Sequence, residues 1–85
     1  MPEISRFLGI IISMHYRDHN PPHFHAKLGN YKISVDIGTG TVSGKFPKRA
    51  LNAVLDWHDL HKKELLQDWE LAALKKTLNK IKPLE

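Results

Sequence analysis

The stretch DHNPPHFHA, from Asp18 to Ala26, concentrates side chains that can transfer protons or bind ions. It holds three of the chain's six histidines, and imidazole both titrates near neutral pH and is the commonest metal ligand in proteins. Two prolines restrict the backbone inside the stretch, so less conformational entropy is lost when it holds one geometry. These features make the stretch the candidate functional site.

Two of these histidines, His23 and His25, stand two residues apart in a segment with strand character. Side chains alternate along a strand, so both imidazoles should point to one face, about 6.5–7 Å apart at their Cα atoms, while Phe24 points to the other. Two rings on one face can reach a single small target. The spacing therefore predicts a shared phosphate or metal ion.

The first interpretation is metal-free acid–base cleavage of a phosphodiester, with His23 and His25 as the acid and base and Asp18 orienting a ring. The order of acid and base stays open, because each ring's protonation depends on its neighbours. Basic side chains around Phe46–Pro47 would add a phosphate-binding patch at a helix start. The expected substrate-binding residues are Arg17, His19, Asn20, Lys27, Lys45, Lys48 and Arg49.

Three other interpretations of the stretch remain. His19, His23 and His25 could bind a divalent transition metal and leave one coordination position open. The rings could instead bind without chemistry, by donating hydrogen bonds or stacking on bases. In the third, the histidines line a polar strand face and Asp18 caps a turn.

The 85-residue chain carries 13 Lys and Arg against 9 Asp and Glu, a formal charge of +4, and its sequence pI is about 9.5. A basic domain is attracted to polyanions such as nucleic acid or an acidic protein. A chain this short buries only about 60% of its unfolded surface, so its core is thin and any site should be a shallow groove. A partner protein or a homodimer would add to that core.

Cysteine is absent, which excludes disulfides, thiolate zinc sites and a cysteine nucleophile and fits a reducing cytoplasm. The longest apolar run, Leu8 to Ile12, is too short to span a membrane, and no cleavage site of small residues follows it. We therefore expect a cytoplasmic protein without a signal peptide or a membrane partner.

Residues 1–85 are expected to form a single α+β domain, β-rich over 4–45, helical over 47–76 and irregular over 77–85. The first part predicts an antiparallel meander of three to four strands, with Gly9 as a bulge or twist point in the first. Turn residues separate the segments and polar residues alternate with apolar ones. The expected strands are Phe7–Tyr16, His23–Leu28, Tyr31–Ile37 and Thr41–Gly44.

The second part has apolar residues at helical spacing. A long helix is expected from about Pro47 to about Leu66, since proline suits the first helical turn. A shorter helix is expected from Asp68 to Lys76, with Asp68 as its N-cap. Both helices should cover one face of the meander and leave the other face for a partner.

Three segments together resemble the bacterial family called Domain of Unknown Function 4160: PEISRFLGIIISM, DHNPPHFHA and FPKRALNAVLDWHDLHKKELLQDWELA. The resemblance covers almost the whole chain, and DHNPPHFHA is its most specific part. It implies a gene beside that of a second small protein, of the family called Domain of Unknown Function 2442, which is sometimes joined to a helix-turn-helix region. That arrangement is similar to a toxin–antitoxin module, and it assigns no catalytic residue.

The residues and the resemblance together lead to one expectation, a toxin-like component that binds RNA and cleaves it through the histidine stretch. It would pair with a small antitoxin-like protein and need no cofactor. Two alternatives stay open, a non-enzymatic module that pairs with a small partner and a histidine-based metal-binding domain.

Overall fold

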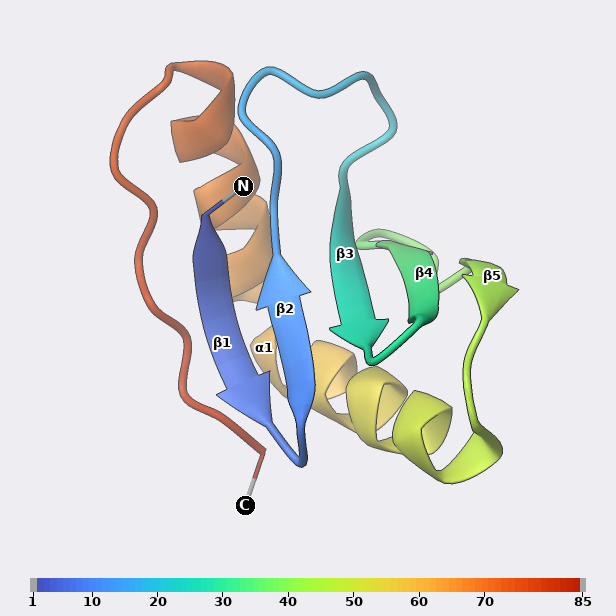
Figure 1. Cartoon of the computed structure of the whole chain (residues 1–85). Coiled ribbons are helices and arrows are strands. Elements are labelled where there is room, and N and C mark those ends of the chain that lie inside the picture. Colours follow the sequence, from blue (N-terminus) through green and yellow to red (C-terminus); the bar gives the residue numbers. More distant parts are fainter. Residues whose placement is uncertain (1, 85) are drawn as a thin grey trace.

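The structure, a computed structural model, describes residues 2–84. Five strands form one antiparallel sheet in which neighbours in sequence are neighbours in space, and a long helix follows (Figure 1). The elements are β1 (Glu3–Phe7), β2 (Ile10–Ser13), β3 (His23–Leu28), β4 (Tyr31–Asp36), β5 (Val42–Lys45) and α1 (Lys48–Ala73). The α+β class is confirmed, but the sheet has five strands where three to four were expected.

The fifth strand comes from a hairpin inside the segment predicted as one strand, Phe7–Tyr16. The chain reverses at Leu8 and Gly9, and Phe7 pairs directly with Ile10. Both turn residues have positive φ, 52° and 76°, as a two-residue hairpin turn of the primed type requires. Gly9 is therefore a turn residue and not a bulge, and the apolar Leu8 conceals the turn in the sequence.

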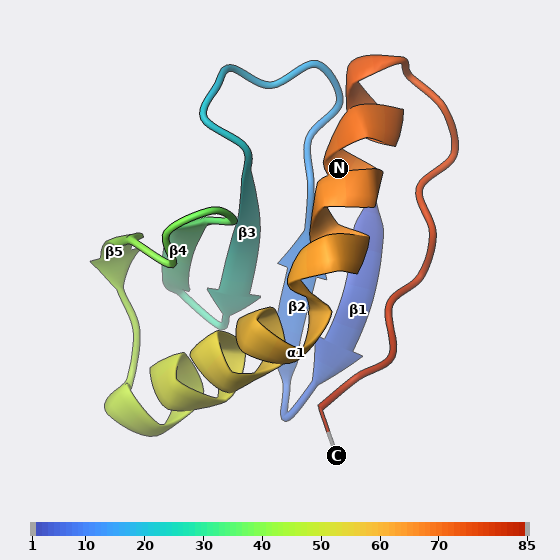
Figure 2. The same cartoon turned by 180° about the vertical axis from the view of Figure 1, so that it is seen from behind.

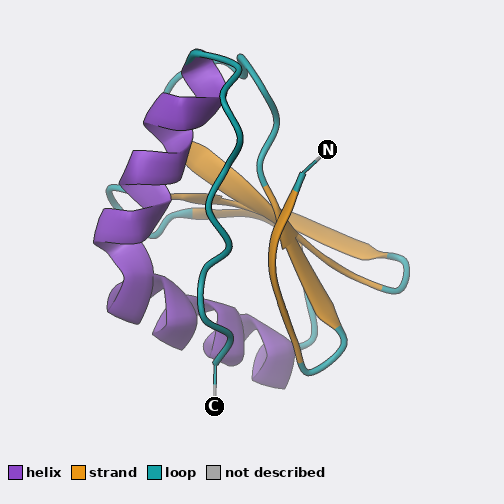
Figure 3. Cartoon of the chain, turned by 90° about the vertical axis from the view of Figure 1, so that its left-hand side faces the viewer, coloured by secondary structure: helices purple, strands orange, loops and turns teal. Residues whose placement is uncertain are grey.

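The core lies between α1 and one face of the sheet, which we call the inner face (Figures 2 and 3). Apolar residues on alternate strand positions point inward, and Trp57 of α1 is fully buried against them. The Trp57 ring lies 5.5 Å from that of Phe7 and 5.6 Å from that of Phe24, centroid to centroid. No described helix packs across the opposite, outer face, although Trp69 of α1 reaches the ring of His23 at the loop end of that face.

The helical part is one helix with a kink, which makes the prediction of a second helix from Asp68 wrong. The kink is at His61, where φ is −123° and ψ is 21°. Asp68 is not an N-cap, because it lies inside α1 and is fully buried. The helix ends in a Schellman motif, in which the N–H groups of Lys75 and Lys76 bond to the carbonyls of Ala72 and Leu71.

The segment 77–84 has no regular secondary structure, as expected, and Glu85 lies outside the described residues. It runs beside β1 (Figure 1), where the Ile81 N–H donates to the Ile4 carbonyl at 2.8 Å. The Asn79 N–H donates to the Asp68 carboxylate at 2.9 Å, and Trp57 Nε1 donates to the Lys82 carbonyl at 2.9 Å. The tail therefore ties α1 to the edge of the sheet.

Among the helices of residues 2–84, none combines the length and the apolar character needed to cross a membrane.

Candidate functional site

The histidine stretch starts in the loop between β2 and β3 and continues into β3 (Figure 1). Backbone hydrogen bonds hold this loop at two points. The Arg17 N–H donates to the Ala72 carbonyl at the end of α1, at 3.2 Å. The Ile37 N–H donates to the Pro22 carbonyl, at 2.9 Å. The end of the helix and the end of β4 therefore position the loop.

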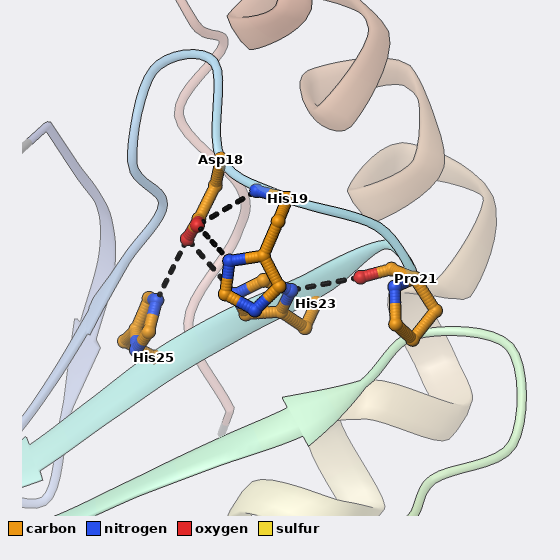
Figure 4. A network of polar contacts seen from close by, with 5 residues as sticks. All are labelled: Asp18, His19, Pro21, His23 and His25. Carbon is orange, nitrogen blue, oxygen red and sulfur yellow. Dashed lines mark hydrogen bonds and ion pairs between the residues drawn. The ribbon is translucent and has the colours of Figure 1, made fainter.

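His23 and His25 lie on the outer face of β3, and Phe24 is buried on the inner face. Their rings make an edge contact with centroids 5.0 Å apart, and both rings point toward Asp18 (Figure 4). The predicted shared face is confirmed. His23 is the more buried of the two, because its ring also lies 5.3 Å from that of Trp69 on α1.

Asp18 is the centre of the site (Figure 4). Its Oδ1 accepts the His19 N–H at 2.8 Å and lies 2.9 Å from His19 Nδ1. Its Oδ2 lies 2.9 Å from His23 Nε2 and 3.4 Å from His25 Nε2. Burial raises the pKa of Asp18, but the His19 N–H, the His25 hydrogen bond and the His23 charge outweigh it and lower that pKa to about 2. The carboxylate is therefore ionised at neutral pH.

The two ring nitrogens of His23 both face oxygen acceptors. Nδ1 lies 2.8 Å from the Pro21 carbonyl oxygen, and Nε2 lies 2.9 Å from Asp18 Oδ2. A carbonyl oxygen and an ionised carboxylate only accept hydrogen bonds, so the ring must supply the hydrogen in either contact. One neutral tautomer donates Nδ1–H to Pro21 and the other donates Nε2–H to Asp18, so the tautomer decides which contact is a hydrogen bond.

In His25, Nε2 contacts Asp18 and Nδ1 does not. With Nε2–H donating to Asp18, the neutral ring presents Nδ1 as an acceptor. Burial lowers the pKa of His25, the hydrogen bond to Asp18 opposes that shift, and the neighbouring His15 and His23 lower the pKa further. His25 is therefore neutral at pH 7 and able to accept a proton.

His15 belongs to the site and was not among the predicted site residues. Its ring makes an edge contact with that of His25, with centroids 4.2 Å apart. The register explains the contact, because Ser13 pairs with His25 and His15 lies two residues further on the same side. Only the pairing of β2 with β3, which the sequence does not give, could have identified it.

Two hollows on the outer face meet at His25. The larger, about 380 Å³, is lined by His19, Pro21, His23, His25, Ser34, Asp36, Thr41 and Ser43. The smaller, about 230 Å³, includes Ser13, His15, His25 and two lysines, Lys27 and Lys32. We call the larger hollow the histidine groove. Its floor contains residues of β4 and β5 that no sequence motif marked, because only sheet pairing brings them beside β3.

Three lysines form a row across the outer face beside these hollows. Lys27 of β3 pairs with Lys32 of β4, and Lys32 pairs with Lys45 of β5. All three are exposed. His25, Ser34 and Ser43 form the next row toward the loop in the same register. We call Lys27, Lys32 and Lys45 the lysine row.

The structure separates the remaining predicted substrate-binding residues. His19 lines the histidine groove, with its side chain 83% exposed. Arg17 and Asn20 are exposed on the loop and line neither hollow. Lys48 and Arg49 lie in the first turn of α1, at the far end of the molecule from the loop (Figure 1). The patch at the helix start is therefore apart from the histidines.

Two groups of described residues could hold a metal ion, and Asp18 belongs to both. One is His15, Asp18 and His25, and the other is Asp18, His19 and His23. In each group the potential ligand atoms lie within 4.8 Å of one another. The predicted trio of His19, His23 and His25 is not such a group, because Asp18 lies between the rings.

Comparison with known proteins identifies a family and nothing more specific. No curated protein and no solved structure matches the chain. The family model described as domain of unknown function DUF4160 matches residues 9–70, a segment that contains β2 to β5, the whole histidine stretch and most of α1. Because the match covers well over half of the sequence, the chain belongs to the DUF4160 family.

Proposed function

We propose that this chain is the toxin-like component of a bacterial two-gene module, which binds RNA on the outer face of its sheet and cleaves it at the histidine groove. It acts in the cytoplasm, and a small antitoxin-like protein is its partner. The observation that carries the proposal is the lysine row. It lies next to the row of paired residues that contains His25, on the sheet face opposite α1.

The lysine row supports the binding step. Like charges directly opposite each other on neighbouring strands repel and destabilise a sheet. Lys27, Lys32 and Lys45 occupy such positions, and no ion pair to an acidic side chain is found for them within residues 2–84. A phosphate backbone laid across the strands would neutralise all three and release its own counterions.

The arrangement of the imidazoles supports the cleavage step. A ribonuclease of this kind forms a bond from the 2′-oxygen to phosphorus, breaks the bond from phosphorus to the 5′-oxygen, and leaves a cyclic phosphate and a hydroxyl. His25 Nδ1 would take the 2′-hydroxyl proton, and His23 Nε2 would give the leaving oxygen the proton that it otherwise donates to Asp18. Asp18 holds both rings, and Lys27 on the same face of β3 would bind the phosphate.

RNA binding tests the first step. Replacing Lys27, Lys32 and Lys45 together by alanine should weaken binding of single-stranded RNA and lower the slope of log K against log salt by about 2, because about 0.7 of a counterion is released per phosphate contact. The matched control replaces Lys48, Arg49 and Lys63, which are exposed on α1. Equal losses of RNA affinity in the two triple variants would mean that net charge alone, and not a defined binding site, determines binding. That result would contradict the proposal.

Cleavage tests the second step. The wild-type chain should cleave RNA in the presence of a chelator, and His25→Ala should lower the rate by at least about 100-fold, the usual contribution of a general base. The control is His61→Ala, a histidine on α1 that pairs with Glu64. A chain that binds RNA without cleaving it would be a binding protein, and one that does neither would be a protein–protein interaction module.

A further inference from the structure

Asp18, His19 and His23 present their polar atoms to a common point at the wall of the histidine groove (Figure 4). Asp18 Oδ1 lies 2.9 Å from His19 Nδ1, and Asp18 Oδ2 lies 2.9 Å from His23 Nε2. Ligands of a tetrahedral zinc ion with bonds of about 2.0–2.1 Å lie about 3.3 Å apart. Each of these two nitrogen–oxygen distances is within a few tenths of an ångström of that spacing, and the potential ligand atoms of all three residues lie within 4.8 Å of one another.

The contacts of His23 suit a metal ligand. With its Nδ1–H donated to the Pro21 carbonyl, its Nε2 lone pair points toward Asp18 Oδ2, where one ion could contact both atoms. Histidine ligands commonly donate the other ring N–H to a backbone carbonyl, which fixes the ring and its tautomer. His23 has that arrangement, and its side chain is only 11% exposed.

We propose that Asp18, His19 and His23 form a binding site for a divalent transition-metal ion of the zinc type. Two imidazoles and one carboxylate supply three nitrogen and oxygen ligands, a set that suits zinc and its neighbours over magnesium or calcium. His19 and His23 both line the histidine groove, so the fourth coordination position opens into it. A ligand in the groove, or water, would complete the coordination.

The second group, His15, Asp18 and His25, is the weaker candidate. Its Asp18 contact is longer, 3.4 Å from Oδ2 to His25 Nε2. No hydrogen bond from a ring nitrogen of His15 or His25 to a backbone carbonyl is found among the described residues, so neither ring has the support that Pro21 gives to His23. The proposal therefore assigns the ion to His19 and His23.

The metal site does not depend on the proposed function, because the ion can bind in the absence of RNA. It also extends that function, since an ion on His23 would remove this ring from proton transfer. The same cluster would then be active in its metal-free form and blocked in its metal-bound form.

Calorimetric titration with zinc chloride alone tests the site on the full chain after dialysis against a chelator. We expect one equivalent to bind, and His19→Ala and Asp18→Asn each to weaken binding by at least about tenfold. His19 is the decisive position because its exposed side chain can be removed without loss of packing. His15→Ala, which disrupts only the other group, should retain affinity within about twofold.

Two results would overturn the assignment. Dissociation constants weaker than about 1 mM for the folded wild-type chain would exclude the site. Unchanged affinity in His19→Ala together with loss in His15→Ala would place the ion in the other group. Circular dichroism of each variant checks the fold, and the absorption spectrum of the cobalt-loaded chain provides a second readout, because tetrahedral cobalt absorbs more strongly than octahedral cobalt. If the chain did not bind zinc, the proposal of RNA binding by the lysine row would be unaffected. The two proposals can therefore be tested separately.

Discussion

The chain holds two aspartates whose surroundings are opposite, and the contrast explains which region is the site. Asp18 lies under an open face with hydrogen-bond donors around both carboxylate oxygens, and its pKa is lowered to about 2. Asp68 is fully buried in α1, its Oδ1 accepts only the Asn79 N–H, and its Oδ2 has no partner. Burial raises the pKa of Asp68, an effect that the Asn79 hydrogen bond opposes and the charge of Glu64 adds to.

The comparison indicates that an aspartate can organise a site where hydrogen-bond donors surround its carboxylate. Asp18 can orient several imidazoles, because its carboxylate is ionised and His19, His23 and His25 surround it. The Asp68 carboxylate has one donor among the described residues, the Asn79 N–H, and that hydrogen bond joins α1 to the tail. We therefore interpret Asp68 as a structural residue and Asp18 as a site residue.

The largest expected effect is that of Asp18→Ala on the histidine groove. The change leaves the buried His23 ring without its Nε2 partner and His25 without an orienting group. The rate of RNA cleavage should fall by at least about 100-fold, and the free energy of unfolding by about 2 kcal/mol. Cleavage assays and urea unfolding in chelator measure both. Asp56→Ala, an exposed position on α1, is the control.

A smaller effect is the loss of stability in acid that comes from Asp18. Its pKa is about 2 in the folded chain against an ordinary value of 3.8, so the folded state binds the proton more weakly than the unfolded state. The stabilisation is therefore complete above about pH 4 and is lost as the pH falls toward 2, with an amplitude of about 1–2 kcal/mol. Urea unfolding of the metal-free chain between pH 5 and pH 2 measures it. Asp18→Asn should lack this component, and an identical pH profile in that variant would contradict the assignment.

Much of the fold follows from local patterns, and the errors have identifiable causes. Tyr31–Ile37 alternates strictly, and β4 forms there with Ile33 and Val35 buried. The sequence does not reveal the turn at Leu8–Gly9, because an apolar side chain occupies a position that a polar residue usually marks. The sequence predicts a helix start at Asp68 because aspartate favours N-caps, whereas tertiary packing places it in the helix interior.

The sequence predicts the part of the candidate site that lies within one strand. It does not predict the part that depends on contacts between strands. The shared face of His23 and His25 follows from the two-residue period of a strand. His15, Ser34 and Ser43 come from other strands, and only the pairing register brings them beside His25. The role of Asp18 between the rings depends on the path of the loop, which hydrogen bonds to Ala72 and from Ile37 determine.

Asp68 should have the opposite pH dependence, because its pKa is raised in the folded chain. Burial keeps its pKa raised in the folded chain, so the folded state binds the proton more tightly than the unfolded state, and stability rises as the pH falls from neutrality toward the ordinary value of 3.8. Asp68→Asn keeps an acceptor for the Asn79 N–H and removes the titration. The stability of the wild-type chain relative to Asp68→Asn should therefore increase between pH 7 and pH 4. If the difference in unfolding free energy between the two chains stayed constant across this range, burial would not disfavour the ionised form of Asp68.

The smallest predicted effect concerns the helix end near Asp68. Lys75 has a φ of 56° at the position of the Schellman motif that glycine usually occupies. Lys75→Gly should therefore stabilise the chain by about 0.5–1 kcal/mol, because a side chain at positive φ costs about 1–2 kcal/mol and the extra freedom of glycine in the unfolded state offsets part of that gain. Thermal unfolding measures it, with Lys76→Gly as the control. Metal binding and RNA cleavage should not change, because Lys75 lines neither hollow at the histidines. If Lys75→Gly altered cleavage without altering stability, the helix end would act on the site, and the separation drawn between the two aspartates would not hold.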